Sequence, residues 1–147
     1  MGQGDPSRLN RLINRLQLND EVEIIGQIKH EQVFDLLNQS DIYIQPSKQE
    51  GLPRAVIEAM SKACPIFGAN TGGIPELILP TCIFQKGNIK QIESLLSNID
   101  KSFLAKMAQM NFETAKNYLP EVLTERRRGF YENFINENFP NEAKQHP

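Results

Sequence analysis

Two glutamates, eight positions apart, bracket the start of an expected helix. Glu50 lies just before the helix expected over residues 53–63, and Glu58 lies within it. The unpaired N–H groups and the positive dipole end of a helix N-terminus suit an anion, typically a phosphate. Gly51 has no side chain and would allow a ligand to approach the backbone closely. Taken alone, the loop is equally compatible with a simple turn of the chain.

The helix around Glu58 is apolar nearly all round, which predicts a largely buried helix. A carboxylate in that setting needs a hydrogen-bonding partner. Arg54 at i−4 is one candidate, but arginine before glutamate is the weaker order and places a cation at the positive end of the helix dipole. We therefore favour an anionic ligand near Arg54, with Glu58 accepting hydrogen bonds from ligand hydroxyls.

The spacing of the two glutamates narrows the ligand. At a rise of ~1.5 Å per residue, they are separated by about 9 Å of helix plus the turn. That is wide for an acid and a nucleophile on one glycosidic bond, whose carboxyl groups lie about 5–9 Å apart. It suits a ligand with two hydroxyl-rich ends joined by a phosphate bridge, as in a nucleotide-sugar.

The elements that would position these residues alternate between helix and strand. Strands are expected at residues 22–26, 42–44, 65–68 and 82–84. Helices are expected from Pro6 onward (with Asp5 as its cap), around 33–37, and over 53–63, 74–79 and 89–99, with two more reaching about residue 139. This order predicts an α/β fold with a Rossmann-like parallel sheet and helices on both faces. Such sheets bind ligands at the carboxyl ends of their strands.

Composition excludes several classes of protein. The 147 residues carry 16 basic and 18 acidic side chains, a net charge of −2, which argues against a nucleic-acid partner. The two cysteines form neither a disulfide framework nor a CxxC metal site, and no Asp-x-Asp occurs. No apolar run is long enough to span a membrane, and no signal peptide is visible. We expect a cytoplasmic domain without a metal or other cofactor.

The sequence from Glu50 to Met60, EGLPRAVIEAM, resembles the E-x7-E motif of family 4 retaining glycosyltransferases with the GT-B fold. The flanking segments SDIYI, PS, PI and TGGIPEL occur in the order found in that family. The resemblance covers residues 1–90 closely and the helical end loosely. It implies the C-terminal, donor-binding half of such an enzyme.

The resemblance also implies roles for individual residues. Glu50 would be the catalytic residue and contact hydroxyls of the donor sugar, and Glu58 would accept from the ribose. The other donor-binding positions would be Ile28 in the loop against the nucleobase and Ser47, Gly51, Leu52, Pro53 and Arg54. The role of Arg54 at the phosphates is our hypothesis, because the family does not fix that position.

A second loop, with Gly72 and Gly73, has two interpretations. It could cradle the donor, or it could be a tight turn with Pro75 early in a helix and Glu76 favouring its dipole. We favour the tight turn.

The resemblance divides the chain into three parts. Residues 1–118 would be a partial Rossmann-like domain that begins after a strand not included. Residues 119–139 would form a helix that crosses to a missing N-terminal domain, and residues 140–147 a polar tail. We expect the apolar surface of that helix to cause self-association or poor order.

The function implied is transfer of a sugar from a nucleotide-sugar to an acceptor hydroxyl with retention, in polysaccharide or lipopolysaccharide biosynthesis. We expect the sequence to be a fragment that binds nucleotide weakly and is inactive alone, from a parent that acts in the cytoplasm or at the inner membrane face. The acceptor would bind to the missing domain. The alternative is a non-catalytic nucleotide-binding or interaction module.

Overall fold

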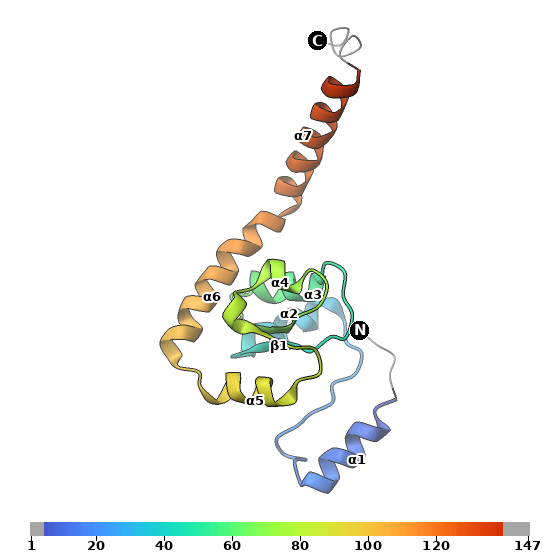
Figure 1. Cartoon of the computed structure of the whole chain (residues 1–147). Helices are drawn as coiled ribbons and strands as arrows, with labels where there is room; N and C mark the ends of the chain where they lie inside the picture. The colour runs from blue at the N-terminus through green and yellow to red at the C-terminus, as the bar shows by residue number, and fades with distance from the viewer. Residues whose placement is uncertain (1–4, 140–147) are drawn as a thin grey trace. The chain divides into compact units, whose positions relative to one another are not determined.

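The computed structural model describes residues 5–139 (Figure 1). In chain order its elements are α1 (Ser7–Leu16), α2 (His30–Gln39), β1 (Tyr43–Gln45), α3 (Arg54–Ser61), β2 (Ile66–Ala69), α4 (Ile74–Leu77), the 3-10 helix η1 (Pro80–Cys82), β3 (Ile83–Phe84), α5 (Ile89–Ser97), α6 (Lys101–Ala115), the 3-10 helix η2 (Lys116–Tyr118) and α7 (Pro120–Asn138). The polar tail expected at residues 140–147 lies outside the described residues.

The sheet is parallel and its strands follow the order β1-β2-β3. Tyr43 pairs with Ile66 in the register of β1 and β2, and Gly68 pairs with Ile83 in that of β2 and β3. All four residues of the central strand β2 are buried, as expected for a parallel strand covered by helices. The predicted parallel α/β fold is therefore confirmed, and three of the four expected strands form within one or two residues of their predicted bounds.

The chain divides into two compact units, Met1–Leu36 and Leu37–Pro147. In the first unit, α1 begins at Ser7, and Asp5 accepts a hydrogen bond from the Ser7 N–H at 2.9 Å. The residue at the cap position is Pro6, not Asp5 as predicted, and no side chain caps the helix, which starts one residue later than expected. Gln17 ends α1 in the left-handed conformation with φ 56°.

The strand predicted at residues 22–26 does not form. This segment is irregular, and Val22, Ile24 and Ile25 are exposed. A strand needs hydrogen bonds from a neighbouring strand, and the described sheet consists of β1, β2 and β3 alone. β-branched residues raise the propensity for a strand but do not supply that partner.

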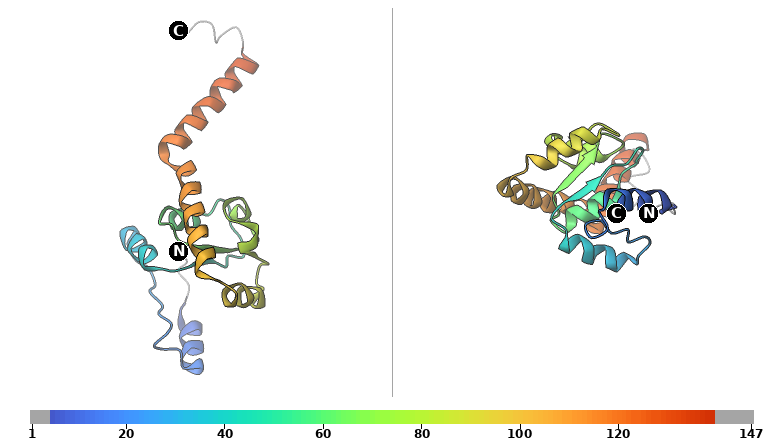
Figure 2. Two further views of the ribbon diagram at one scale, coloured as in Figure 1. Left: turned by 90° about the vertical axis from the view of Figure 1, so that its left-hand side faces the viewer. Right: turned by 90° about the horizontal axis from the view of Figure 1, so that it is seen from below.

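The core of the second unit lies around β2. Helices α3, α4 and α6 contact this strand, and α3 also packs against α6; Figure 2 shows the sheet and α6 from two further directions. The largest fully buried side chains include Phe67, Phe84, Met60 and Met107. Buried Asn111 of α6 donates from Nδ2 to the carbonyl of Cys64 at 2.8 Å, which satisfies both polar groups.

Helix α3 is less buried than the sequence predicts. Val56, Ala59 and Met60 are buried, but Ala55 is exposed and Ile57 and Glu58 are half-buried. Helix α3 therefore buries one face against the sheet and α6, and an apolar composition all round did not require burial all round.

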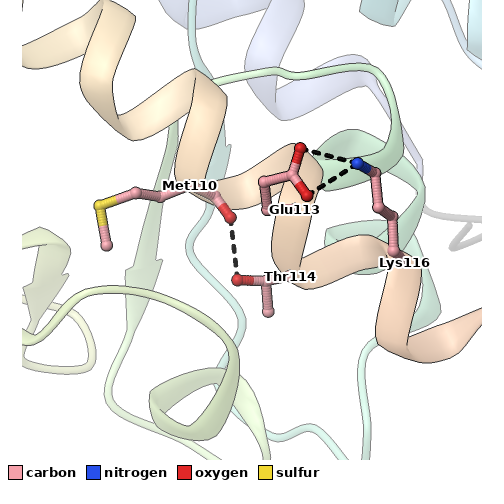
Figure 3. Close-up of polar contacts among 4 residues, drawn as sticks. All are labelled: Met110, Glu113, Thr114 and Lys116. Carbon is pink, nitrogen blue, oxygen red and sulfur yellow. Dashed lines mark hydrogen bonds and ion pairs between the residues drawn. The ribbon is translucent and has the colours of Figure 1, made fainter.

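The end of α6 leads through η2 into α7. Lys116 Nζ lies 2.7 Å from both carboxylate oxygens of Glu113, and Thr114 donates to the carbonyl of Met110 at 2.9 Å (Figure 3). These groups are exposed, so the ion pair contributes little to stability. The structure has a continuous α7, and no helix within residues 5–139 has the length and apolar character needed to cross a membrane.

Candidate functional site

Two loops lie side by side at the carboxyl ends of β1 and β2. The first comprises residues 46–53 and the second residues 70–73. The Gly73 N–H donates to the carbonyl of Gly51 at 2.8 Å, and Thr71 Oγ1 donates to the carbonyl of Lys48 at 3.4 Å. These bonds join the loop that carries Glu50 to the loop that carries the two glycines. The site is therefore where ligands bind in parallel α/β sheets.

The glycines of the second loop are explained by this contact. Gly72 has φ 53°, and a Cβ atom there would lie 2.1 Å from the carbonyl oxygen of Glu50. A Cβ on Gly73 would lie 3.1 Å from the carbonyl oxygen of Gly51. The next residues form α4, with Pro75 at its start and Glu76 in its first turn, as the tight-turn interpretation predicted. Backbone packing therefore requires glycine at position 72 and leaves little room for a side chain at position 73, and a contact of this loop with the donor stays a prediction.

Glu50 is half-buried, and two side chains hold its carboxylate. Gln45 Nε2 donates to Glu50 Oε1 at 2.8 Å, and Ser47 Oγ donates to the same oxygen at 2.5 Å. Gln45 Nε2 also donates to Ser47 Oγ at 2.7 Å. Ser47 and Glu50 are among the site residues that the sequence predicts, whereas Gln45 is not.

Tyr43 extends this set of hydrogen bonds. Its hydroxyl donates to Gln45 Oε1. Burial, followed by the charges of Glu50, Glu58 and Cys64, raises the pKa of Tyr43 to about 12. Strand alternation could have pointed to both missed residues, because Tyr43 and Gln45 lie on the same face of β1, two residues apart.

Glu58 lies in α3 and is half-buried. Its charge raises the pKa of Tyr43 together with that of Glu50, although burial is the larger cause. The two glutamates of the motif therefore both act on the phenol of Tyr43. The fold brings them to one region even though one belongs to a loop and the other to a helix.

The start of α3 is open to an anion. No side chain caps it, which is also true of α1, α4 and α7, whereas Asn88 and Asp100 cap α5 and α6 by accepting from backbone N–H groups. Gly51, Leu52 and Arg54 next to this helix start are exposed. Residues 5–139 contain no group of three or more His, Cys, Asp or Glu side chains placed to hold a metal ion.

Gly51 differs from the glycines of the second loop. A Cβ atom there would meet no atom of the described residues within 4 Å, and its backbone does not adopt a positive φ. Neither packing nor backbone conformation requires glycine at position 51. Pro53, by contrast, is buried and precedes the first residue of α3.

The predicted nucleobase loop belongs to the first unit. Ile28 is half-buried there, and Gly26 has φ 71°, a conformation that favours glycine. Glu50 and Glu58 belong to the second unit. Its contact with a base stays a prediction.

Comparison with known proteins identifies the family to which a chain with this fold and these loops belongs. Residues 1–111 match the family model described as glycosyl transferases group 1. The chain belongs to this family.

Two curated relatives and one solved structure are similar to the chain. The phosphatidylinositol N-acetylglucosaminyltransferase gpi3 subunit of Schizosaccharomyces pombe is 27% identical over 135 residues, which are 88% of this chain and 29% of that protein. The amylovoran biosynthesis glycosyltransferase AmsK of Erwinia amylovora is 34% identical over 85 residues, 53% of this chain and 21% of its own length. The chain thus spans less than a third of either relative.

Sucrose-phosphate synthase from Thermosynechococcus elongatus has a similar structure. Its TM-score is 0.78 at 19% identity, and the match covers 93% of this chain and 38% of that one. The likeness shows the fold, which is part of the GT-B architecture, as the sequence predicted.

Proposed function

We propose that the chain forms the donor-binding side of a family 4 retaining glycosyltransferase that uses a nucleotide-sugar and no metal ion. The transferred group would be a hexose or a hexose derivative. The names of the two relatives include an N-acetylglucosaminyltransferase and a polysaccharide-forming enzyme. They support a role in glycan assembly, either on a lipid or in a polysaccharide.

The observation that carries the proposal is the arrangement at the start of α3. A carboxylate held by two donors, Glu50, lies in the loop before a helix whose N-terminus no side chain caps. Between them lies Gly51, whose missing side chain leaves open space at the backbone. A carboxylate suits sugar hydroxyls, and free N–H groups suit a diphosphate.

The proposed roles follow from these chemical preferences. Glu50 accepts hydrogen bonds from hydroxyls of the donor sugar, and Glu58 accepts from those of the ribose. The N–H groups at the start of α3 and the exposed Arg54 stabilise the charge that develops on the leaving nucleoside diphosphate. Ile28 and its loop contact the nucleobase through backbone groups.

We further propose that the 147-residue chain binds the nucleotide weakly and transfers no sugar alone. The acceptor site and further phosphate-binding cations would come from another domain of a parent that works in the cytoplasm or at the inner membrane face. The alternative is a non-catalytic nucleotide-binding module. It would bind the same nucleotides, but the longer protein to which it belongs would not transfer a sugar.

Titration of the chain with UDP, GDP, ADP and their sugar conjugates tests the proposal. We expect one nucleotide to shift backbone amide resonances at residues 50–58. Arg54→Ala and Glu58→Gln should each weaken its binding by about tenfold, the effect of losing one hydrogen bond to a charged group. Arg126→Ala on exposed α7 is the matched control and should bind like the wild type. No binding by the wild type, or unchanged affinity in both site variants, would contradict the proposal.

A further inference from the structure

The hydrogen bonds from Tyr43 through Gln45 to Glu50 form a relay that neither the motif nor the family match assigns. We propose that Tyr43 and Gln45 are positioning residues that fix the orientation of the Glu50 carboxylate and thereby select the sugar part of the donor. This inference rests on the proposed function.

Both ends of the Gln45 side-chain amide form hydrogen bonds in its observed orientation. Its nitrogen donates to Ser47 Oγ at 2.7 Å and to Glu50 Oε1 at 2.8 Å, and its oxygen accepts from the Tyr43 hydroxyl. A side-chain amide has two donor positions on one end and acceptors on the other. If the amide turned over, its oxygen would face the carboxylate and its nitrogen the hydroxyl. The Tyr43 hydroxyl therefore favours the orientation that presents N–H groups to Glu50.

The carboxylate is held at one oxygen. Gln45 and Ser47 both donate to Oε1 of Glu50, and within residues 5–139 the structure gives no hydrogen bond to Oε2. The second oxygen is left to accept from a ligand hydroxyl. Fixing a glutamate side chain costs conformational entropy. Because the relay already fixes Glu50 in the free protein, this cost does not have to be met when the ligand binds.

Tyr43 is suited to remain the donor at the end of the relay. Burial and the nearby charges of Glu50 and Glu58 raise its pKa to about 12, so the hydroxyl keeps its proton at neutral pH. Gln45 is half-buried in β1, where its neighbours Tyr43 and Ile44 are half-buried as well. A glutamine there has its hydrogen-bonding capacity satisfied within the relay rather than by open solvent.

Binding measurements on the full chain separate a positioning role from a structural one. The two variants are Gln45→Met, which keeps the length of the side chain without its donors, and Tyr43→Phe, which keeps the ring. Gln109→Met on α6 and Tyr131→Phe on α7 change the same residue types at exposed positions and serve as controls. Far-UV circular dichroism confirms that each variant is folded.

The readout is the ratio of two affinities measured by calorimetry, that of the nucleotide-sugar and that of its nucleoside diphosphate. In both relay variants we expect the affinity for the nucleotide-sugar to fall by about three- to tenfold, as for a weakened hydrogen bond to a charged group. The affinity for the nucleoside diphosphate should not change, so the ratio should fall by the same factor. Equal losses for both ligands, or no loss for either, would overturn the positioning role. In a chain that already carries Glu50→Gln, neither relay variant should lower the ratio further, because Tyr43 and Gln45 act through the carboxylate that this change removes.

A ligand-independent measurement distinguishes failure of this inference from failure of the proposed function. Tyr43→Phe should shift the side-chain amide resonances of Gln45 and the carboxyl carbon of Glu50, whereas Tyr131→Phe should leave both in place. If the wild type binds none of the nucleotides, the proposed function is wrong and sugar selection falls with it. The resonance shifts then still decide whether the relay orients Glu50, and their absence overturns it.

Discussion

Replacing Gly72 by alanine should destabilise the protein by separating the two loops of the site. Alanine at φ 53° costs about 1–2 kcal/mol for a left-handed backbone. Its Cβ atom would lie 2.1 Å from the carbonyl oxygen of Glu50, so the backbone must shift, at about 1–3 kcal/mol for overpacking. The shift also endangers the 2.8 Å bond from the Gly73 N–H to Gly51, worth about 1 kcal/mol. The expected loss is about 3–6 kcal/mol.

Urea unfolding followed by far-UV circular dichroism measures this loss. Two matched glycines separate its causes. Gly87 has φ 78° but no atom within 4 Å of a Cβ, so Gly87→Ala should cost only the backbone part, about 1–2 kcal/mol. Gly51 has neither constraint, so Gly51→Ala should change stability by less than about 0.5 kcal/mol. Equal losses for Gly72→Ala and Gly87→Ala would refute the contact between the loops.

Further measurements test other parts of the structure. Gly51→Ala should weaken nucleotide binding despite its neutral effect on stability, and unchanged binding would argue against close ligand approach at that backbone. The raised pKa of Tyr43, about 12, means that the unfolded state loses its proton first, so stability is full below pH 10 and falls between about pH 10 and 12. Because the phenol is partly exposed, solvent screening reduces this loss of stability to about 1 kcal/mol. Tyr43→Phe should remove the part of the loss that comes from the phenol, and a pH profile of stability identical to that of the wild type would contradict the raised pKa. Asn111→Ala should cost about 2–4 kcal/mol, because it leaves the Cys64 carbonyl unsatisfied and opens a cavity, whereas exposed Asn133→Ala should be neutral. Phe130 and Phe134 of α7 are 66% and 49% exposed, and we expect the chain to self-associate through them. Light scattering should then give a mass above that of the monomer, and Phe130→Glu should lower this mass more than Asn133→Glu. A monomeric wild type at every concentration would rule this out.

Local patterns in the sequence predicted most of the second unit. The three strands that form are short apolar runs, and the helices α3, α5 and α6 follow from the spacing of their apolar residues. The predicted strand at residues 22–26 failed because β-branched residues favour an extended backbone without supplying the neighbouring strand that holds it. Helix α3 is less buried than its apolar composition predicts for a related reason, since composition does not say which faces have a neighbour.

The sequence alone predicts Glu50, Gly51, Arg54 and Glu58 as site residues, because their types and spacing around a helix start suit the binding of an anion and of hydroxyl groups. For Gly72 and Gly73 the sequence favours a tight turn over a donor cradle. Only the tertiary structure shows that Gly72 packs against the carbonyl of Glu50, 22 residues earlier in the chain, and this packing requires glycine whether or not the loop also contacts the donor. It also decided what holds Glu50, because the hydrogen bonds from Gln45 and Ser47 depend on how the loop folds back beyond the end of β1.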